Sequence, residues 1–133
     1  MSKIKLDDRL LAVASLVRNG KRVADIGTDH GYLVAYLVEN GMCPSGIAAD
    51  LRKGPLENAR QTVIQQGLSD KIRLILSDGL MNVPENSADD IVIAGMGGMF
   101  LFSIISYTVL KKRVQEAVRM TDGIWESAGI RTA

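Results

Sequence analysis

Short apolar runs alternate along this chain with segments of helical periodicity, and this alternation restricts the fold more than any other feature. Nearly every position in the runs is apolar, rather than every second one, which is typical of strands buried on both faces of a parallel sheet. Four runs have this character: RVADIG (22–27), SGIAAD (45–50), KIRLILSDG (71–79) and ADDIVIAGMGG (88–98). We therefore predict an α/β fold, an open parallel sheet with flanking helices and right-handed crossovers.

The segments around these runs predict the helices. Apolar residues recur at helical spacing, and Gly41 and Gly67 follow two of the segments at the position where helices often end. Pro55 falls in the first turn of its segment, where proline is tolerated. The expected helices are LDDRLLAVASLVR (6–18), GYLVAYLVENG (31–41), GPLENARQTVIQQGL (54–68) and a long helix over about 98–119.

Length and composition indicate one domain and exclude several classes of function. We expect the 133 residues to form a single domain, with its motifs in 22–98 and a tail at 111–133 of unclear role. The net charge of +1 gives no general basic field. The only cysteine, Cys43, fits a reducing compartment, and the longest apolar stretch, 99–110, is too short to span a bilayer. We expect a cytoplasmic protein with no membrane association and no metal site.

Acids and glycines lie where the predicted strands end. Since ligands of open parallel sheets bind outside the carboxyl ends of the strands, these residues should share one rim. Gly27 and Gly31 would allow a sharp turn and a close ligand approach, and the helix beginning near Gly31 would offer free N–H groups that suit a carboxylate or phosphate. Asp50 could accept hydrogen bonds from ribose hydroxyls, and Asp78, followed by Gly79, could accept from an adenine amino group.

The turn DIGTDHG (25–31) discriminates between nucleoside cofactors. NAD-binding turns have the pattern G-x-G-x-x-G, whereas this turn has no second glycine two residues after Gly27. Asp29 would repel a pyrophosphate, but Asp25 or Asp29 would suit an ammonium group. S-adenosyl-L-methionine (SAM) is therefore favoured over NAD. Each acid alone could be a solvated strand end or a turn residue, and His30 alone could be structural. The indication of a binding site is that each acid falls at the same end of a successive strand.

Four segments resemble the TrmK-type bacterial tRNA (adenine-N1) methyltransferases, which are class I, Rossmann-like SAM enzymes. The segments are VADIGTDHGYL, AADLRKGPLENAR, LSDGL and DDIVIAGMGG, and the resemblance extends over about residues 4–103. It implies methylation of N1 of an adenine in tRNA, with tRNA as the partner and SAM as the cofactor.

The resemblance also implies roles for individual residues. Asp29 and His30 would be catalytic: Asp29 would accept a hydrogen bond from the adenine amino group, and His30 would orient Asp29 or relay a proton. Gly97 and Gly98 would contact the substrate base. The cofactor would be held by Asp25, Gly27, Thr28, Gly31, Asp50, Leu51, Asp78, Gly79, Ala94, Gly95 and Met96.

Members of that family are longer than this chain and continue the sheet with further strands. We therefore expect an incomplete class I methyltransferase fold, C-terminally shortened, in which the outer edge of the fourth strand needs a cover. Either the tail helix or a second subunit could provide it, so a homo-oligomer is possible. A non-catalytic SAM-binding remnant is the alternative function, and an NAD-dependent oxidoreductase is a third.

Overall fold

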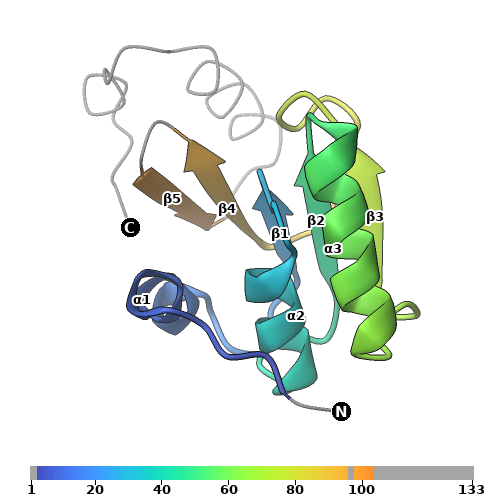
Figure 1. Cartoon of the computed structure of the whole chain (residues 1–133). Helices are drawn as coiled ribbons and strands as arrows, with labels where there is room; N and C mark the ends of the chain where they lie inside the picture. The colour runs from blue at the N-terminus through green and yellow to red at the C-terminus, as the bar shows by residue number, and fades with distance from the viewer. Residues whose placement is uncertain (1–2, 96–97, 104–133) are drawn as a thin grey trace.

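A computed structural model describes residues 3–95 and 98–103 of the chain. Helices and strands alternate through most of this part, as the sequence predicts (Figure 1). The elements in chain order are α1 (Asp8–Leu16), β1 (Val23–Ile26), α2 (Tyr32–Glu39), β2 (Gly46–Asp50), α3 (Lys53–Gln65), β3 (Ile72–Leu76), β4 (Asp90–Gly95) and β5 (Gly98–Ser103).

The strands form one sheet in the order β3-β2-β1-β4-β5. β1, β2, β3 and β4 are parallel, so the predicted open parallel sheet is confirmed. All residues of the central strands β1 and β2 are buried, which explains their continuous apolar sequences. The carboxyl ends of β1, β2, β3 and β4 consequently lie at one edge of the sheet.

The prediction of a helix over 98–119 is wrong for residues 98–103, which form β5. β5 pairs antiparallel with β4 (Figure 1), and the register places Gly95 opposite Gly98. A short apolar run cannot be assigned to helix or strand by periodicity alone, and pairing with β4 satisfies backbone groups that a helix would leave unpaired. The rest of the expected helix and the tail at 111–133 lie outside the described residues.

β5 also covers the edge of β4 that was expected to be open. The unpaired edge of β4 was the reason to expect a tail helix or a second subunit there. With β5 in place, that reason no longer applies to β4, and β5 itself becomes the last strand of the described sheet.

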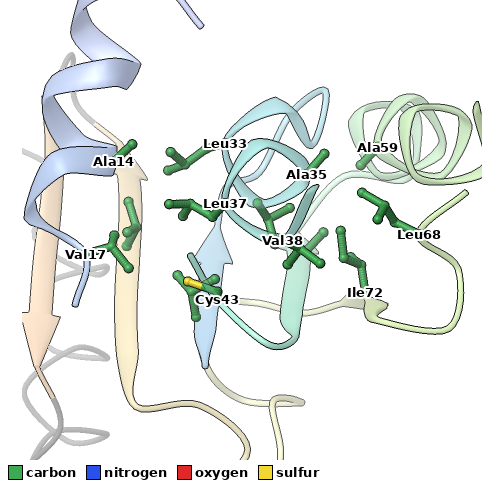
Figure 2. Packing of buried hydrophobic residues seen from close by; sticks show 14 of the residues in the cluster. Ala14, Val17, Leu33, Ala35, Leu37, Val38, Cys43, Ala59, Leu68 and Ile72 are labelled. Atoms are coloured by element: carbon green, nitrogen blue, oxygen red, sulfur yellow. The ribbon is translucent and has the colours of Figure 1, made fainter. Parts of the chain in front are cut away.

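The three helices pack on one face of the sheet through a continuous apolar core. Figure 2 shows Leu33 and Leu37 of α2 directed toward α1, with Ala14 opposite them. On the other side of α2, Ala35 and Ala59 lie where α2 and α3 approach each other. Burying each large aliphatic side chain stabilises the fold by about 1.5–3 kcal/mol, so this core fixes the helices on the sheet.

The opposite face of the sheet packs against the long connection between β3 and β4. Ala24, Ile26, Ile91 and Ile93 alternate with residues of the helix-side core, and all four are buried. Three residues of the connection belong to the same cluster: Leu80, Val83 and Ala88. Among the described residues, no helix is both long and apolar enough to cross a membrane.

Two ion pairs, Arg18–Asp90 and Arg22–Asp89, lie at the edge of the sheet opposite the strands' carboxyl ends. The Asp90 side chain is fully buried and accepts hydrogen bonds from the Arg18 backbone N–H and from its Nε, each at 2.8 Å. The Asp89 carboxylate likewise accepts hydrogen bonds from the Arg22 backbone N–H at 2.9 Å and from the Arg22 Nε at 3.0 Å. These contacts join the segment after α1 to the beginning of β4, so both acids of "DDIVIAG" serve structure at this edge.

Candidate functional site

A cavity of about 630 Å³ opens at the carboxyl ends of the strands. Its wall includes residues that follow β1, β2 and β3, together with the beginning of α1. Nine predicted site residues lie in the wall: Asp25, Gly27, Thr28, Asp29, His30, Asp50, Leu51, Asp78 and Gly79. The fold therefore gathers at one cavity residues that are more than fifty positions apart in the sequence.

The turn after β1 is fixed to β2 by backbone hydrogen bonds. The N–H groups of Gly27 and Thr28 both donate to the Ala49 carbonyl oxygen, at 2.9 and 3.0 Å. Gly27 has a φ of 77°, a left-handed conformation that glycine adopts without steric cost. The turn thus leaves β1 sharply and places the following residues on the cavity.

Asp25 is a buried carboxylate with unused hydrogen-bonding capacity. One oxygen, Oδ2, accepts a hydrogen bond from the Thr28 hydroxyl at 3.0 Å, whereas Oδ1 has no donor among the described residues. Burial raises the pKa of Asp25 to about 7; the Thr28 hydrogen bond opposes this shift, and the charge of Asp50 adds to it. A cationic group in the cavity would satisfy Oδ1 and favour the ionised carboxylate.

Asp50 is held by backbone groups on both sides of its carboxylate. The Asp29 N–H donates to Oδ2 at 3.2 Å, and the Arg52 N–H donates to Oδ1 at 3.0 Å. Asp50 is buried, and the Arg52 guanidinium is 3.8 Å from Oδ1. Each oxygen keeps a lone pair for a ligand, and the carboxylate is already oriented to accept a pair of hydroxyl donors.

Asp29 links the first strand end to the second. Its φ of 56° is left-handed, a conformation that costs most side-chain-bearing residues about 1–2 kcal/mol but is better tolerated by aspartate. This conformation directs the Asp29 N–H to Asp50. The backbone of Asp29 therefore has a structural function, while its side chain is exposed at the cavity rim.

The side chains of Asp29 and His30 lie close together without a hydrogen bond. His30 Nε2 is 3.9 Å from Asp29 Oδ1, and both side chains are about half exposed or more. The His30 ring stacks on the Tyr32 ring with centroids 5.1 Å apart and an interplanar angle of 15°. The rim thus offers a carboxylate next to a preformed aromatic surface on which a flat base could stack.

The turn after β3 forms another part of the wall. The Ser77 hydroxyl donates to the Gly79 carbonyl at 2.7 Å and accepts from the Asn82 N–H at 3.0 Å. Asp78 lies between these fixed positions and is exposed. Leu51, which is 64% exposed, lies beyond the end of β2 and presents an uncovered apolar side chain to the cavity.

Gly31 has a packing function, and the cofactor contact expected of it stays a prediction. It is not part of the cavity wall; it precedes α2 with a φ of 73°. A Cβ at this position would be 3.1 Å from the Ala59 Cβ and 3.2 Å from its Cα. The glycine is therefore needed for the close approach of α2 to α3.

The glycine-rich segment after β4 is described only in part. Ala94 and Gly95 end β4, and Gly98 begins β5, with Ala94 opposite Met99 in the register. Met96 and Gly97 lie outside the described residues. The ligand contacts expected of Ala94, Gly95, Met96, Gly97 and Gly98 stay predictions.

Several wall residues were not found from the sequence. Arg52, Tyr32 and Ser77 adjoin predicted site residues, so their proximity in sequence was an available signal. Asp7, Arg9, Leu10 and Met99 reach the cavity through the docking of α1 and β5, which no local pattern indicates. Ile26, Leu33 and Ile93 complete the wall.

Comparison with known proteins gives relatives that are named as tRNA methyltransferases. The tRNA (adenine(22)-N(1))-methyltransferase of Bacillus subtilis is 40% identical over 105 residues, which are 79% of this chain and 44% of that protein. A crystal structure of a Streptococcus pneumoniae putative tRNA (m1A22) methyltransferase in complex with SAM has 37% identity and a TM-score of 0.69. The match covers 84% of this chain and 48% of that one.

A further solved structure is TrmK of M. capricolum in complex with S-adenosyl-homocysteine, with 41% identity and a TM-score of 0.64 over 69% of this chain and 42% of that one. The chain thus spans somewhat less than half the length of the relatives it matches. These similarities confirm the resemblance to TrmK-type enzymes. Residues 6–121 match the family described as methyltransferase domain, and the chain belongs to that family.

Proposed function

We propose that the cavity binds SAM and that the chain acts as a SAM-dependent methyltransferase. The buried Asp25 carboxylate is the observation that most strongly supports a ligand with an ammonium group, because its Oδ1 has no donor in the described part of the chain. SAM has such a group together with an adenosine moiety. The M. capricolum and S. pneumoniae relatives were solved with the product and the cofactor, which supports the same ligand here.

The other acids fit the remaining polar groups of that cofactor. Asp50 is oriented by two backbone N–H groups and would accept the ribose hydroxyls. Asp78 would accept from the adenine amino group, and the exposed Leu51 would contact the adenine face. When bound, SAM would supply an electrophilic methyl group, and the residues of the chain would position the acceptor and exclude water.

The proposed acceptor is N1 of an adenine in tRNA, as in the relatives whose names state that activity. The His30–Tyr32 pair would stack on the flat base at the rim. Asp29 would accept a hydrogen bond from the exocyclic amino group and stabilise positive charge that develops on the base. His30 would orient Asp29 or relay a proton, and Gly97 and Gly98 would leave room for the base. tRNA modification and the single cysteine support a cytoplasmic location.

A methylation assay tests this proposal directly. Purified protein, SAM with a labelled methyl group and unmodified tRNA should give labelled tRNA whose N1-methyladenine stops reverse transcription at one position. Asp29→Ala should retain SAM binding and lose most of the methylation. If Asp29→Ala retains full activity, its assigned role is wrong; if the unaltered chain binds SAM but methylates no tRNA, the acceptor is wrong.

The second candidate is a non-catalytic SAM-binding remnant, which would keep the cavity and its acids without acting on tRNA. It predicts SAM binding without methylation of any tRNA in the same assay. An NAD-dependent oxidoreductase is less compatible with the site, because a pyrophosphate would face Asp29 at the cavity rim. Competition between SAM and NAD for the cavity separates that third candidate from the other two.

A further inference from the structure

We infer that Arg9 of α1 binds the carboxylate of the cofactor's methionine moiety. The inference rests on the proposed function and adds to it the residue that recognises the only anionic group of SAM. Among the predicted site residues, only Gly31 at the beginning of α2 was expected to offer groups that suit a carboxylate, and Gly31 is not in the cavity wall.

The charges of the cavity wall leave few places for a carboxylate. The acids among the described wall residues are Asp7, Asp25, Asp29, Asp50 and Asp78; the arginines are Arg9 and Arg52, and His30 lies next to Asp29, 3.9 Å from its carboxylate. A carboxylate in such a wall needs a cation or several N–H donors. Arg52 is already associated with Asp50, its Nε lying 3.8 Å from Oδ1. The Arg9 guanidinium forms no hydrogen bond or ion pair within residues 3–95 and 98–103.

The two arginines also lie at different ends of the cavity. Arg52 follows β2, beside the groups proposed to hold the ribose and adenine, and β2 and β3 lie on one side of β1 in the sheet. α1 contacts α2 and β5, and β5 lies on the other side of β1 (Figure 1). Arg9 therefore approaches the cavity from the side away from the nucleoside, where the amino-acid end of the cofactor would extend past Asp25.

The position of Arg9 within α1 has no evident structural purpose. The Asp7 carboxylate caps the helix by accepting from the Leu10 N–H at 2.8 Å, and Asp8 adds negative charge to the first turn. Both acids are favourable at a helix N-terminus, whereas a cation is not. Arg9 is exposed and outside the apolar core, but Leu10 beside it packs on that core and fixes the helix. A helix anchored in this way can hold a guanidinium at a set place on the cavity.

Paired ligands test the inference without an activity measurement. SAM and decarboxylated SAM share the adenosine, sulfonium and ammonium groups and differ in the carboxylate. Calorimetric titration of Arg9→Ala should show SAM affinity reduced by at least about tenfold, the loss expected for a charge-assisted hydrogen bond. Affinity for decarboxylated SAM should be unchanged, and Arg9→Lys should recover part of the SAM affinity.

Lys5→Ala is the matched control, because it removes an exposed positive charge four residues away that is not in the cavity wall. It should leave both affinities unchanged. Equal weakening of both ligands by Arg9→Ala, or weakening of neither, would overturn the inference. If the unaltered protein binds neither ligand, the proposed function itself fails. Circular dichroism of each variant shows whether it is folded.

Discussion

Asp25 is the residue whose environment says most about the cavity. A carboxylate that is 2% exposed, with one oxygen bound to a hydroxyl and the other without a donor in the described residues, is destabilising when ionised. Its raised pKa of about 7 is the expected response to burial. The site therefore retains an unfavourable charge that a cationic ligand would neutralise. A carboxylate with a purely structural function would have its partners within the protein.

This environment predicts a pH dependence of SAM binding. In the free protein Asp25 is protonated below pH 7 and ionised above it. Because the ammonium group needs the ionised form, SAM affinity should fall as the pH decreases below 7, by up to about tenfold per pH unit. Titrations at pH 6 and pH 8, in buffers with different ionisation enthalpies, should show proton release on binding at the lower pH only.

Asp25→Asn is the control for that measurement. The amide does not titrate, so its SAM affinity should be weaker than that of the unaltered protein at pH 8 and should not fall when the pH is lowered from 8 to 6. An unaltered protein whose SAM affinity is the same at both pH values would show that Asp25 does not contact the ammonium group.

The contacts between helices and strands explain why four strands were predictable from the sequence and why β5 was not. β1, β2, β3 and β4 were predictable because continuous apolar runs ending in acids or glycine have one common structural explanation. The residues of β5 were predicted as helix, because a short apolar sequence is compatible with both a helix and a strand. Only the pairing with the open edge of β4 determines that they form a strand. Gly31 was correctly expected in a sharp turn, but its contact with Ala59 depends on the packing of α2 against α3.

Gly31→Ala should destabilise the protein by about 2–4 kcal/mol, from a left-handed φ and a steric overlap with α3. Gly41→Ala is a matched control, because Gly41 has nearly the same φ, 72° against 73°, and no atom within 4 Å of an added Cβ. Urea unfolding of both variants separates the cost of the left-handed φ, which both share, from the cost of the steric overlap, which only Gly31→Ala has. Equal destabilisation would contradict the proposed need for close α2–α3 packing.

The ion pairs at the opposite edge of the sheet predict that substitutions of the neighbouring acids Asp89 and Asp90 differ in their effect on stability. Asp90→Asn should destabilise the fold by about 1–3 kcal/mol, since a fully buried carboxylate that contacts the backbone N, Nε and Nη2 of Arg18 is replaced by an amide. Asp89→Asn should cost less, because the side chain is one-third exposed and solvent replaces the lost bonds. Thermal unfolding of both variants checks the order, and a larger loss for Asp89→Asn would contradict it.

The Arg22–Asp89 pair also has a defined pH dependence. Hydrogen bonds from Arg22 lower the pKa of Asp89 to about 2, below its ordinary value of 3.8. The stability from this pair is therefore present above pH 3.8 and is lost as the pH falls toward 2. Asp89→Asn should reduce the slope of unfolding free energy against pH in that interval. An unchanged slope would show that the pair does not persist in solution.

The sequence predicted that acids and glycines at the strand ends share one rim, and six of them, Asp25, Gly27, Asp29, Asp50, Asp78 and Gly79, line one cavity. Strand ends of a parallel sheet meet at one edge, so a local pattern determined a global arrangement. The contribution of α1 was not predictable, because helix docking depends on Leu10 and its neighbours packing across the sheet. The chain spans less than half the length of the relatives it matches.

Calorimetric titration of the purified chain with SAM, with NAD as the control ligand, measures whether the cavity is a SAM site. We expect saturable binding of SAM at one site in the micromolar range and no binding of NAD. No binding of SAM, or equal binding of both ligands, would contradict this expectation.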